Sequence, residues 1–255
     1  MPLVLLLPLT LVQAASWPEV VGVAGEVDGV GRVVCVGKDV WCGPVPSDWR
    51  AVAHFDAVIC VDSVPPESTG EVAVAFAATA YSGLSPAARR ALASAGEGRV
   101  YVHCHHGRHR GPAAGVWLAR RRGLAPDAAA AVLDAAGTGR EFAGLWRDAL
   151  GSLDVPPDEQ PFTPAEPVSL IRRWMAEADR TYDADALTPR QRRLVAEAFR
   201  ESARDETISE PLRNALLDAS RRPLTGTQAD CRACHERFRD SPAPPVATAA
   251  QSRQE

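Results

Sequence analysis

Residues 100–121 read VYVHCHHGRHRGPAAGVWLARR, and this stretch decides the fold. Its first four residues form a short apolar run that is typical of a buried strand. The polar residues that follow predict a loop, and the apolar periodicity over 111–122 predicts a helix. A helix that directly follows a buried strand is typical of an α/β fold, in which reactive groups gather at the carboxyl ends of central strands.

The surrounding sequence predicts the rest of an α/β domain over 17–150. Apolar runs separated by glycine turns predict strands around 32–36, 39–42 and 57–61, with a further strand over 71–78. Ser85-Pro86 has the chemistry of a helix start, which predicts a helix over 87–95, and later helices are expected over 127–136 and 141–150. We therefore expect a central sheet flanked by helices.

The chain downstream of this domain has a different composition. Residues 151–167 hold five prolines and no apolar period, which predicts a linker. Amphipathic patterns over 168–180, 190–204, 212–221 and 227–239 predict an all-α four-helix bundle that spans 168–240. Residues 241–255 are mostly Ala, Pro, Ser and Gln, a composition that predicts a disordered tail.

Charge and hydropathy exclude some functions and suggest a location. A net charge of −4, a pI of about 5.9 and 6% aromatic residues argue against nucleic-acid binding. Residues 1–16 combine an apolar core with small residues, as in a secretory signal peptide, although they lack the usual basic start; a buried strand is the alternative. We expect a periplasmic or otherwise exported protein without stable membrane insertion.

The chain contains six cysteines, at positions 35, 42, 60, 104, 231 and 234. An even number in an exported chain suggests disulfides. Cys35 and Cys42 flank a turn and are candidates for a bond, but they fit equally well as small buried apolar residues.

Cys104 and Arg110 are separated by five residues, with Gly107 between them. A loop that joins a strand to a helix N-terminus directs backbone N–H groups and positive potential toward a bound anion. A cysteine there gains thiolate character, and an arginine can bind two phosphate oxygens at once. Glycine permits the positive φ that such a loop needs. The pattern predicts a nucleophile facing a bound phosphate.

The sequence His103-Cys104-x5-Arg110 resembles the signature of the protein tyrosine and dual-specificity phosphatases, over roughly 20–150. The resemblance implies a cysteinyl-phosphate mechanism on a phosphorylated substrate, with no metal. Cys104 would attack phosphorus, Arg110 would stabilise the transition state, and His103 would precede the nucleophile. The phosphate-binding loop would comprise His105, His106, Gly107, Arg108, His109 and Arg110.

The chain departs from that family in two ways. Gly111 stands where the family usually has a serine or threonine, and no aspartate lies between Ser63 and His103. Ser82 aligns with the usual general acid, for which Asp62, Glu67 and Glu71 are candidate substitutes. Loss of a general acid typically costs about 10²–10⁴-fold in rate with poor leaving groups.

Other interpretations of this loop remain open. The four histidines could bind a metal with Cys104, although metal ligands usually come at wider spacings. A rhodanese-type sulfur transferase also places a cysteine in an anion-binding loop. A purely structural cluster of Cys and His does not explain the positions of Gly107 and Arg110.

A second motif lies near the C-terminus, where Cys231-Arg-Ala-Cys234-His235 forms the attachment signal for c-type haem. The two thiols would form thioethers with haem, and His235 would ligate iron, all from one helix face. Zinc would need further ligands, and a thioredoxin-like C-x-x-C usually follows a strand.

The CRACHERFR sequence at 231–239 resembles cytochromes c′ and c556, over roughly 165–240. This resemblance implies covalent haem c in a four-helix bundle outside the cytoplasm. Met175 would be the sixth iron ligand and would favour electron transfer with a redox partner; otherwise it packs in the core and leaves an open gas-binding position.

Together the motifs predict an exported phosphomonoester phosphatase that carries covalent haem. The alternative is an anion-binding module with impaired catalysis, fused to a cytochrome for electron transfer or gas sensing.

Overall fold

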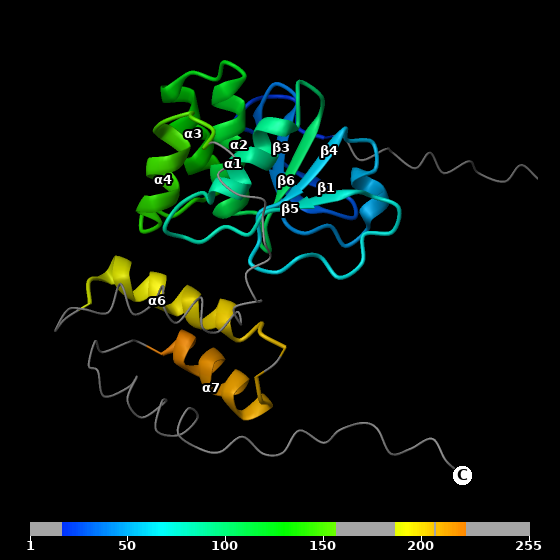
Figure 1. Cartoon of the computed structure of the whole chain (residues 1–255). Helices are drawn as coiled ribbons and strands as arrows, with labels where there is room; N and C mark the ends of the chain where they lie inside the picture. The colour runs from blue at the N-terminus through cyan, green and yellow to red at the C-terminus, as the bar shows by residue number, and fades with distance from the viewer. Residues whose placement is uncertain (1–16, 157–186, 207, 223–255) are drawn as a thin grey trace, which may run out of the picture. The chain divides into compact units, whose positions relative to one another are not determined.

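The computed structural model describes residues 17–156, 187–206 and 208–222. The chain divides into two compact units, Met1–Ala165 and Glu166–Glu255, which we describe separately. The first unit contains every strand in the described residues (Figure 1).

The first unit is built on a six-stranded mixed sheet in the order β1-β2-β3-β6-β4-β5. The strands are β1 (Ala24–Val27), β2 (Gly31–Gly37), β3 (Val40–Gly43), β4 (Ala57–Cys60), β5 (Val74–Phe76) and β6 (Val100–His103). Antiparallel pairing joins β1 to β2 and β2 to β3, whereas β3, β6, β4 and β5 run parallel. The α/β class expected from the sequence is confirmed, and β6 lies in the middle of the parallel part.

Four α-helices accompany this sheet, namely α1 (Pro86–Ser94), α2 (Arg110–Arg121), α3 (Pro126–Ala136) and α4 (Ala143–Leu150). The central helix α2 packs on β2, β3 and β6, and the other three pack against α2. In the described residues, the four α-helices therefore form one layer against the sheet.

The opposite face carries an apolar cluster and a short 3₁₀ helix, η1 (Trp49–Val52). Val33, Trp41, Phe55 and Tyr101 belong to this cluster. Burial of such side chains stabilises by about 25 cal/mol per Å² of apolar surface. Trp17 and the η1 residues Trp49 and Ala51 pack against this cluster.

The antiparallel register excludes a bond between Cys35 and Cys42. Cys42 pairs with Val34, so its neighbour Cys35 points to the other side of the sheet. Cys35 joins the apolar cluster, and the Sγ of Cys42 lies 3.3 Å from the carbonyl oxygen of Gly111 in α2. Both thiols are free and buried, so the second interpretation, that of small buried residues, is the one that holds.

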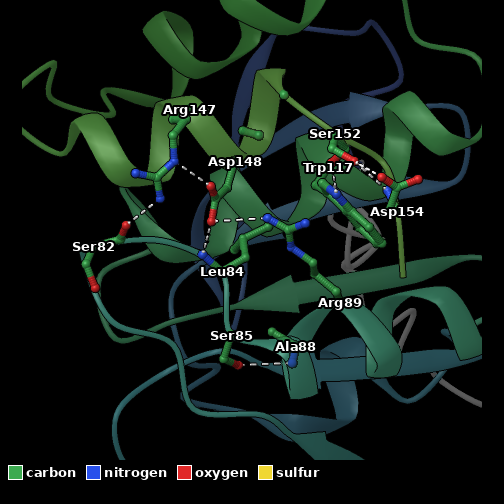
Figure 2. A network of polar contacts seen from close by, with 12 residues as sticks. Ser82, Leu84, Ser85, Ala88, Arg89, Trp117, Arg147, Asp148, Ser152 and Asp154 are labelled. Carbon is green, nitrogen blue, oxygen red and sulfur yellow. Dashed lines mark hydrogen bonds and ion pairs between the residues drawn. The ribbon is translucent and has the colours of Figure 1, made fainter. Parts of the chain in front are cut away.

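The start of the predicted linker is bonded to α2. The indole N–H of Trp117 donates to Ser152 O at 3.1 Å (Figure 2). Arg120 donates to Gly151 O at 2.9 Å. Arg121 donates to Leu153 O at 2.7 Å. Residues 151–153 therefore belong to the first unit, although they form no helix or strand.

The second unit contains two described helices, α6 (Pro189–Ser202) and α7 (Glu210–Arg221), which pack together. Thr188 and Gln191 form a reciprocal capping box at the start of α6. These helices correspond to two of the four that the sequence predicts. The helices expected over 168–180 and 227–239, the signal peptide over 1–16, the end of the linker and the tail over 241–255 lie outside the described residues.

No helix in the described ranges has the length and apolar character needed to cross a membrane.

Candidate functional site

Cys104 follows the last residue of β6, at the carboxyl edge of the parallel strands. His103 pairs with Gly43 of β3 on one side and with Cys60 of β4 on the other, so the ends of three strands meet here. The Cys104 side chain is 3% exposed. Cys104 therefore lies at the usual site location of an α/β sheet, next to the loop that follows β6.

Gly107 allows this loop to fold back against the end of β3. Its φ is +68°, and a Cβ there would lie 2.3 Å from the carbonyl carbon of Gly43. The neighbouring Val45 N–H donates to His105 O at 3.3 Å. No side chain fits at position 107 without displacement of the backbone, so glycine is required both for its φ and for the close approach.

The loop leaves several backbone donors for a ligand. Within the described parts of the chain, the N–H groups of His106, Gly107, Arg108 and His109 donate to no carbonyl or side chain. Thr138 fixes the loop from the other side by donating to Arg108 O at 2.7 Å. Consecutive N–H groups before a helix N-terminus form an anion-binding concavity.

Arg110 is the first residue of α2 and is 2% exposed. Its guanidinium forms a 3.0 Å ion pair with Asp62, which is also buried, and donates a hydrogen bond to the hydroxyl of Ser63. Asp62 and Ser63 follow β4, the strand next to β6. The arginine is thus anchored beside the cysteine loop by the end of the neighbouring strand.

An aromatic cluster completes the surroundings of Arg110. Its guanidinium carbon lies 4.9 Å from the ring centroid of Tyr81, a favourable cation–π distance. Tyr81 packs on Phe142 at 4.6 Å, and the ring of His109 lies 4.2 Å from Phe142. Burial lowers the pKa of His109 to about 4, with nearby Arg110 adding to the effect, so this imidazole is neutral near pH 7.

His103 lies on the other face of the sheet. Its ring stacks on Tyr101 at 5.9 Å and meets Trp49 edge-on at 5.5 Å. Burial lowers its pKa to about 4, and both ring nitrogens are buried without a hydrogen-bond partner in the described residues. His103 is therefore a neutral packing residue behind the loop, and the prediction of a direct catalytic role for it gains no support.

The geometry disfavours a metal site in this loop. The rings of His105 and His106 lie together at 4.3 Å, but those of His103 and His109 pack against different aromatic residues. Over 17–156, 187–206 and 208–222, no three His, Cys, Asp or Glu side chains are grouped so as to hold a metal ion.

The candidates for the general acid occupy different positions. Asp62 is held in the ion pair with Arg110, so its carboxylate anchors the arginine. Glu67 and Glu71 are exposed in the connection after β4. Ser82 is exposed and directly follows Tyr81, so the segment that it occupies does border Arg110.

Gly111 packs directly against Cys104. A Cβ at this position would lie 3.3 Å from the backbone nitrogen and 3.5 Å from the Sγ of Cys104. A side chain at position 111 would therefore press against the backbone of Cys104.

The haem motif and Met175 lie outside the described residues. Cys231, Cys234, His235 and Met175 therefore stay predictions from the sequence.

Sequence reasoning missed two neighbours of Arg110. Ser63 could have been found, because it follows a buried strand that ends at the same sheet edge as Cys104. Tyr81 carries no local signal for its contact with Arg110.

No protein-family model, no curated protein and no solved structure matches this chain.

Proposed function

We propose that the first unit is a cysteine-dependent phosphomonoester phosphatase. The observation that supports this most strongly is the buried Arg110, anchored by Asp62 and Ser63 beside a loop in which the N–H groups of residues 106–109 have no acceptor in the described residues. A buried guanidinium and unbonded N–H groups form a site for a dianionic phosphoryl group. Cys104, the first residue after β6, would supply the attacking thiolate.

The reaction would proceed in two displacements. The Cys104 thiolate attacks phosphorus, which forms an S–P bond and breaks the P–O bond to the leaving alcohol or phenol. The leaving oxygen takes a proton from solvent or from a donor at the 80–84 segment. Water then attacks the phosphorus, the S–P bond breaks, and inorganic phosphate leaves as the thiolate returns. The loop N–H groups and Arg110 stabilise charge on the phosphoryl oxygens in both steps.

The test is hydrolysis of p-nitrophenyl phosphate by the full chain, compared with Cys104→Ser. This activated leaving group needs little protonation, so the absence of an aspartate at position 82 should matter little. The matched control is Cys60→Ser, at a buried thiol of the neighbouring strand whose pKa burial raises to about 12. We expect turnover to fall at least about 10³-fold in Cys104→Ser and to change little in Cys60→Ser.

The same assay separates the two functions considered for this site. Orthovanadate or phosphate binding without Cys104-dependent turnover would replace the phosphatase by an anion-binding module. Equal losses in the two serine variants would instead mean that buried thiols matter only for folding.

A second proposal concerns the second unit, and the Cys231-Arg-Ala-Cys234-His235 motif carries it. Two thiols and an imidazole at this spacing match covalent haem c attachment, and His235 would be an iron ligand, with Met175 as the sixth. Bound haem would supply one-electron redox chemistry or gas binding. Expression with a periplasmic haem-attachment system should yield a pyridine haemochrome spectrum of c type, which is lost in the double variant Cys231→Ala/Cys234→Ala. An unchanged polypeptide mass would refute the proposal.

A further inference from the structure

The 80–84 segment borders the candidate active site and touches it through Tyr81. The ring of Tyr81 lies under the Arg110 guanidinium at 4.9 Å, and the side chain is 3% exposed. Ser82, at the position aligned with the usual general acid, is the next residue. Whatever fixes this segment therefore also fixes one side of the phosphate-binding arginine.

Asp148, on α4, is the residue that fixes the segment (Figure 2). Its Oδ2 accepts the backbone N–H of Leu84 at 2.8 Å. The same carboxylate pairs with Arg89 of α1 at 3.3 Å and with Arg147 at 2.9 Å. Asp148 thus connects two helices and a loop that are far apart in the sequence.

Arg147 extends this connection to Ser82. Its Nε donates to Asp148 at 2.9 Å while its Nη2 donates to Ser82 O at 3.0 Å. The loop backbone is therefore held at two points, one on each side of Gly83. Two such points define the path of the segment more closely than either contact alone.

The close approach of the segment to α4 leaves no room for a Cβ at Gly83 or Gly144. A Cβ on Gly83, whose φ is +151°, would lie 2.3 Å from Asp148 Oδ2. A Cβ on Gly144 would lie 1.9 Å from Ser82 O. Glycine at both positions lets α4 and the loop backbone come into direct contact.

The charges explain why this contact is centred on a carboxylate. Asp148 is 9% exposed, and a carboxylate at that depth must be paired and hydrogen-bonded. Arg89 and Arg147 satisfy the charge, and Leu84 N–H supplies the further hydrogen bond. The side chain of Arg147 is largely exposed, so Arg89 provides the better-shielded pairing.

We propose that Asp148 is a positioning residue of this site, which holds the 80–84 segment so that Tyr81 keeps Arg110 oriented toward the bound phosphoryl group. This inference rests on the proposed phosphatase function and deepens it. By this proposal, phosphate affinity depends on α4, which acts on Arg110 through the 80–84 segment.

The experiment perturbs the same contact in two independent ways in the full chain. Asp148→Asn keeps an acceptor for Leu84 N–H but removes the charge that pairs with Arg89 and Arg147. Gly144→Ala changes no charge but pushes Ser82 off α4. The matched controls are Asp134→Asn, at an exposed ion pair on α3, and Gly25→Ala, where the nearest atom to the new Cβ would be 3.6 Å away.

We expect the KM for p-nitrophenyl phosphate and the inhibition constant of phosphate to rise together, by roughly tenfold, in both variants. Turnover at saturation should fall less than about threefold, because Cys104 and its loop are unchanged. The double variant should have a KM and a phosphate inhibition constant no higher than those of the more impaired single variant, since both substitutions break the same contact. Circular dichroism and thermal melting establish that each variant is folded at the assay temperature.

The proposal is overturned if the folded variants keep KM and phosphate inhibition within twofold of the wild type, or if the controls lose as much. Absence of Cys104-dependent turnover in the wild type would refute the proposed function instead. Phosphate binding by calorimetry then decides the positioning role: equal affinities in wild type and variants overturn it. Absence of phosphate binding by the wild type overturns both.

Discussion

The neighbouring parallel strands β4 and β6 each carry a cysteine near their carboxyl end, yet their surroundings differ. Cys60 is followed by Val61 and the acidic Asp62, and burial raises the pKa of its thiol to about 12. Cys104 is followed by a loop with a left-handed glycine and then by α2. The two cysteines share a position at a strand end, and the loop and helix that follow Cys104 distinguish it as the proposed nucleophile.

The ends of β4 and β6 also contribute different groups to the candidate site. The end of β6 supplies the thiol and the backbone donors, and the end of β4 supplies the carboxylate and hydroxyl that anchor Arg110. Arg110 follows β6 in the sequence, but its ion pair and hydrogen bond are with residues that follow β4. We expect substitutions in the loop after β6 to lower turnover most, substitutions at the end of β4 to lower it less, and substitutions on the packed face of β6 to lower it least.

The largest effect is expected at Gly107, on the β6 side. Gly107→Ala should lower kcat/KM about 100-fold, because a Cβ 2.3 Å from the backbone of Gly43 must displace the loop. Gly70, after β4, is the matched control. Its φ is +59° and no atom lies within 4 Å of a Cβ there, so Gly70→Ala carries only the cost of the backbone conformation, about 1 kcal/mol in stability. Similar losses of activity in the two variants would contradict the assignment of the loop.

A smaller effect on turnover is expected at Asp62, on the β4 side. Asp62→Asn should lower kcat/KM about tenfold, because the guanidinium loses the charge that orients it. The same change should lower the free energy of unfolding by about 3 kcal/mol, since it breaks a buried ion pair. Steady-state kinetics and urea unfolding measure the two effects. Asp134→Asn, at an exposed pair, should change neither, and a fully active Asp62→Asn enzyme would remove Asp62 from the site.

The smallest effect on turnover, but a clear effect on stability, is expected at His103, which pairs with Cys60 in register. Burial lowers its pKa from 6.5 to about 4, so below pH 6.5 the unfolded state binds a proton that the folded state does not. Stability is therefore complete above pH 6.5 and should fall by about 3 kcal/mol by pH 4. His103→Leu should remove this part of the pH dependence in chemical unfolding.

The pKa of His109 is also lowered to about 4, so His109 should still contribute to the pH dependence of stability in the His103→Leu variant. An NMR titration that gives His103 a pKa near 6.5 would show that the ring is hydrated, and would contradict its assignment to the packed face.

The sequence by itself determined the features that depend on neighbouring residues. The strand, loop and helix around Cys104, Gly107 and Arg110 could be read directly, because apolar period and glycine placement act over a few residues. Ser85-Pro86 and Thr188-Pro189 located the starts of α1 and α6 for the same reason, since both side chains accept a backbone hydrogen bond within their own first turn. The α/β class followed from the order of such elements.

Only the tertiary structure decided which distant residues meet at the site. Asp62, one of three candidate substitutes for the general acid, anchors Arg110, 48 positions along the chain. Asp148 carried no local signal at all, although it holds the loop that contacts this arginine. Strand register separated Cys35 from Cys42, and strand alternation placed His103 and Cys104 on opposite faces. Such contacts depend on how the sheet pairs and how helices pack on it, and the composition and period of a short segment do not encode that pairing.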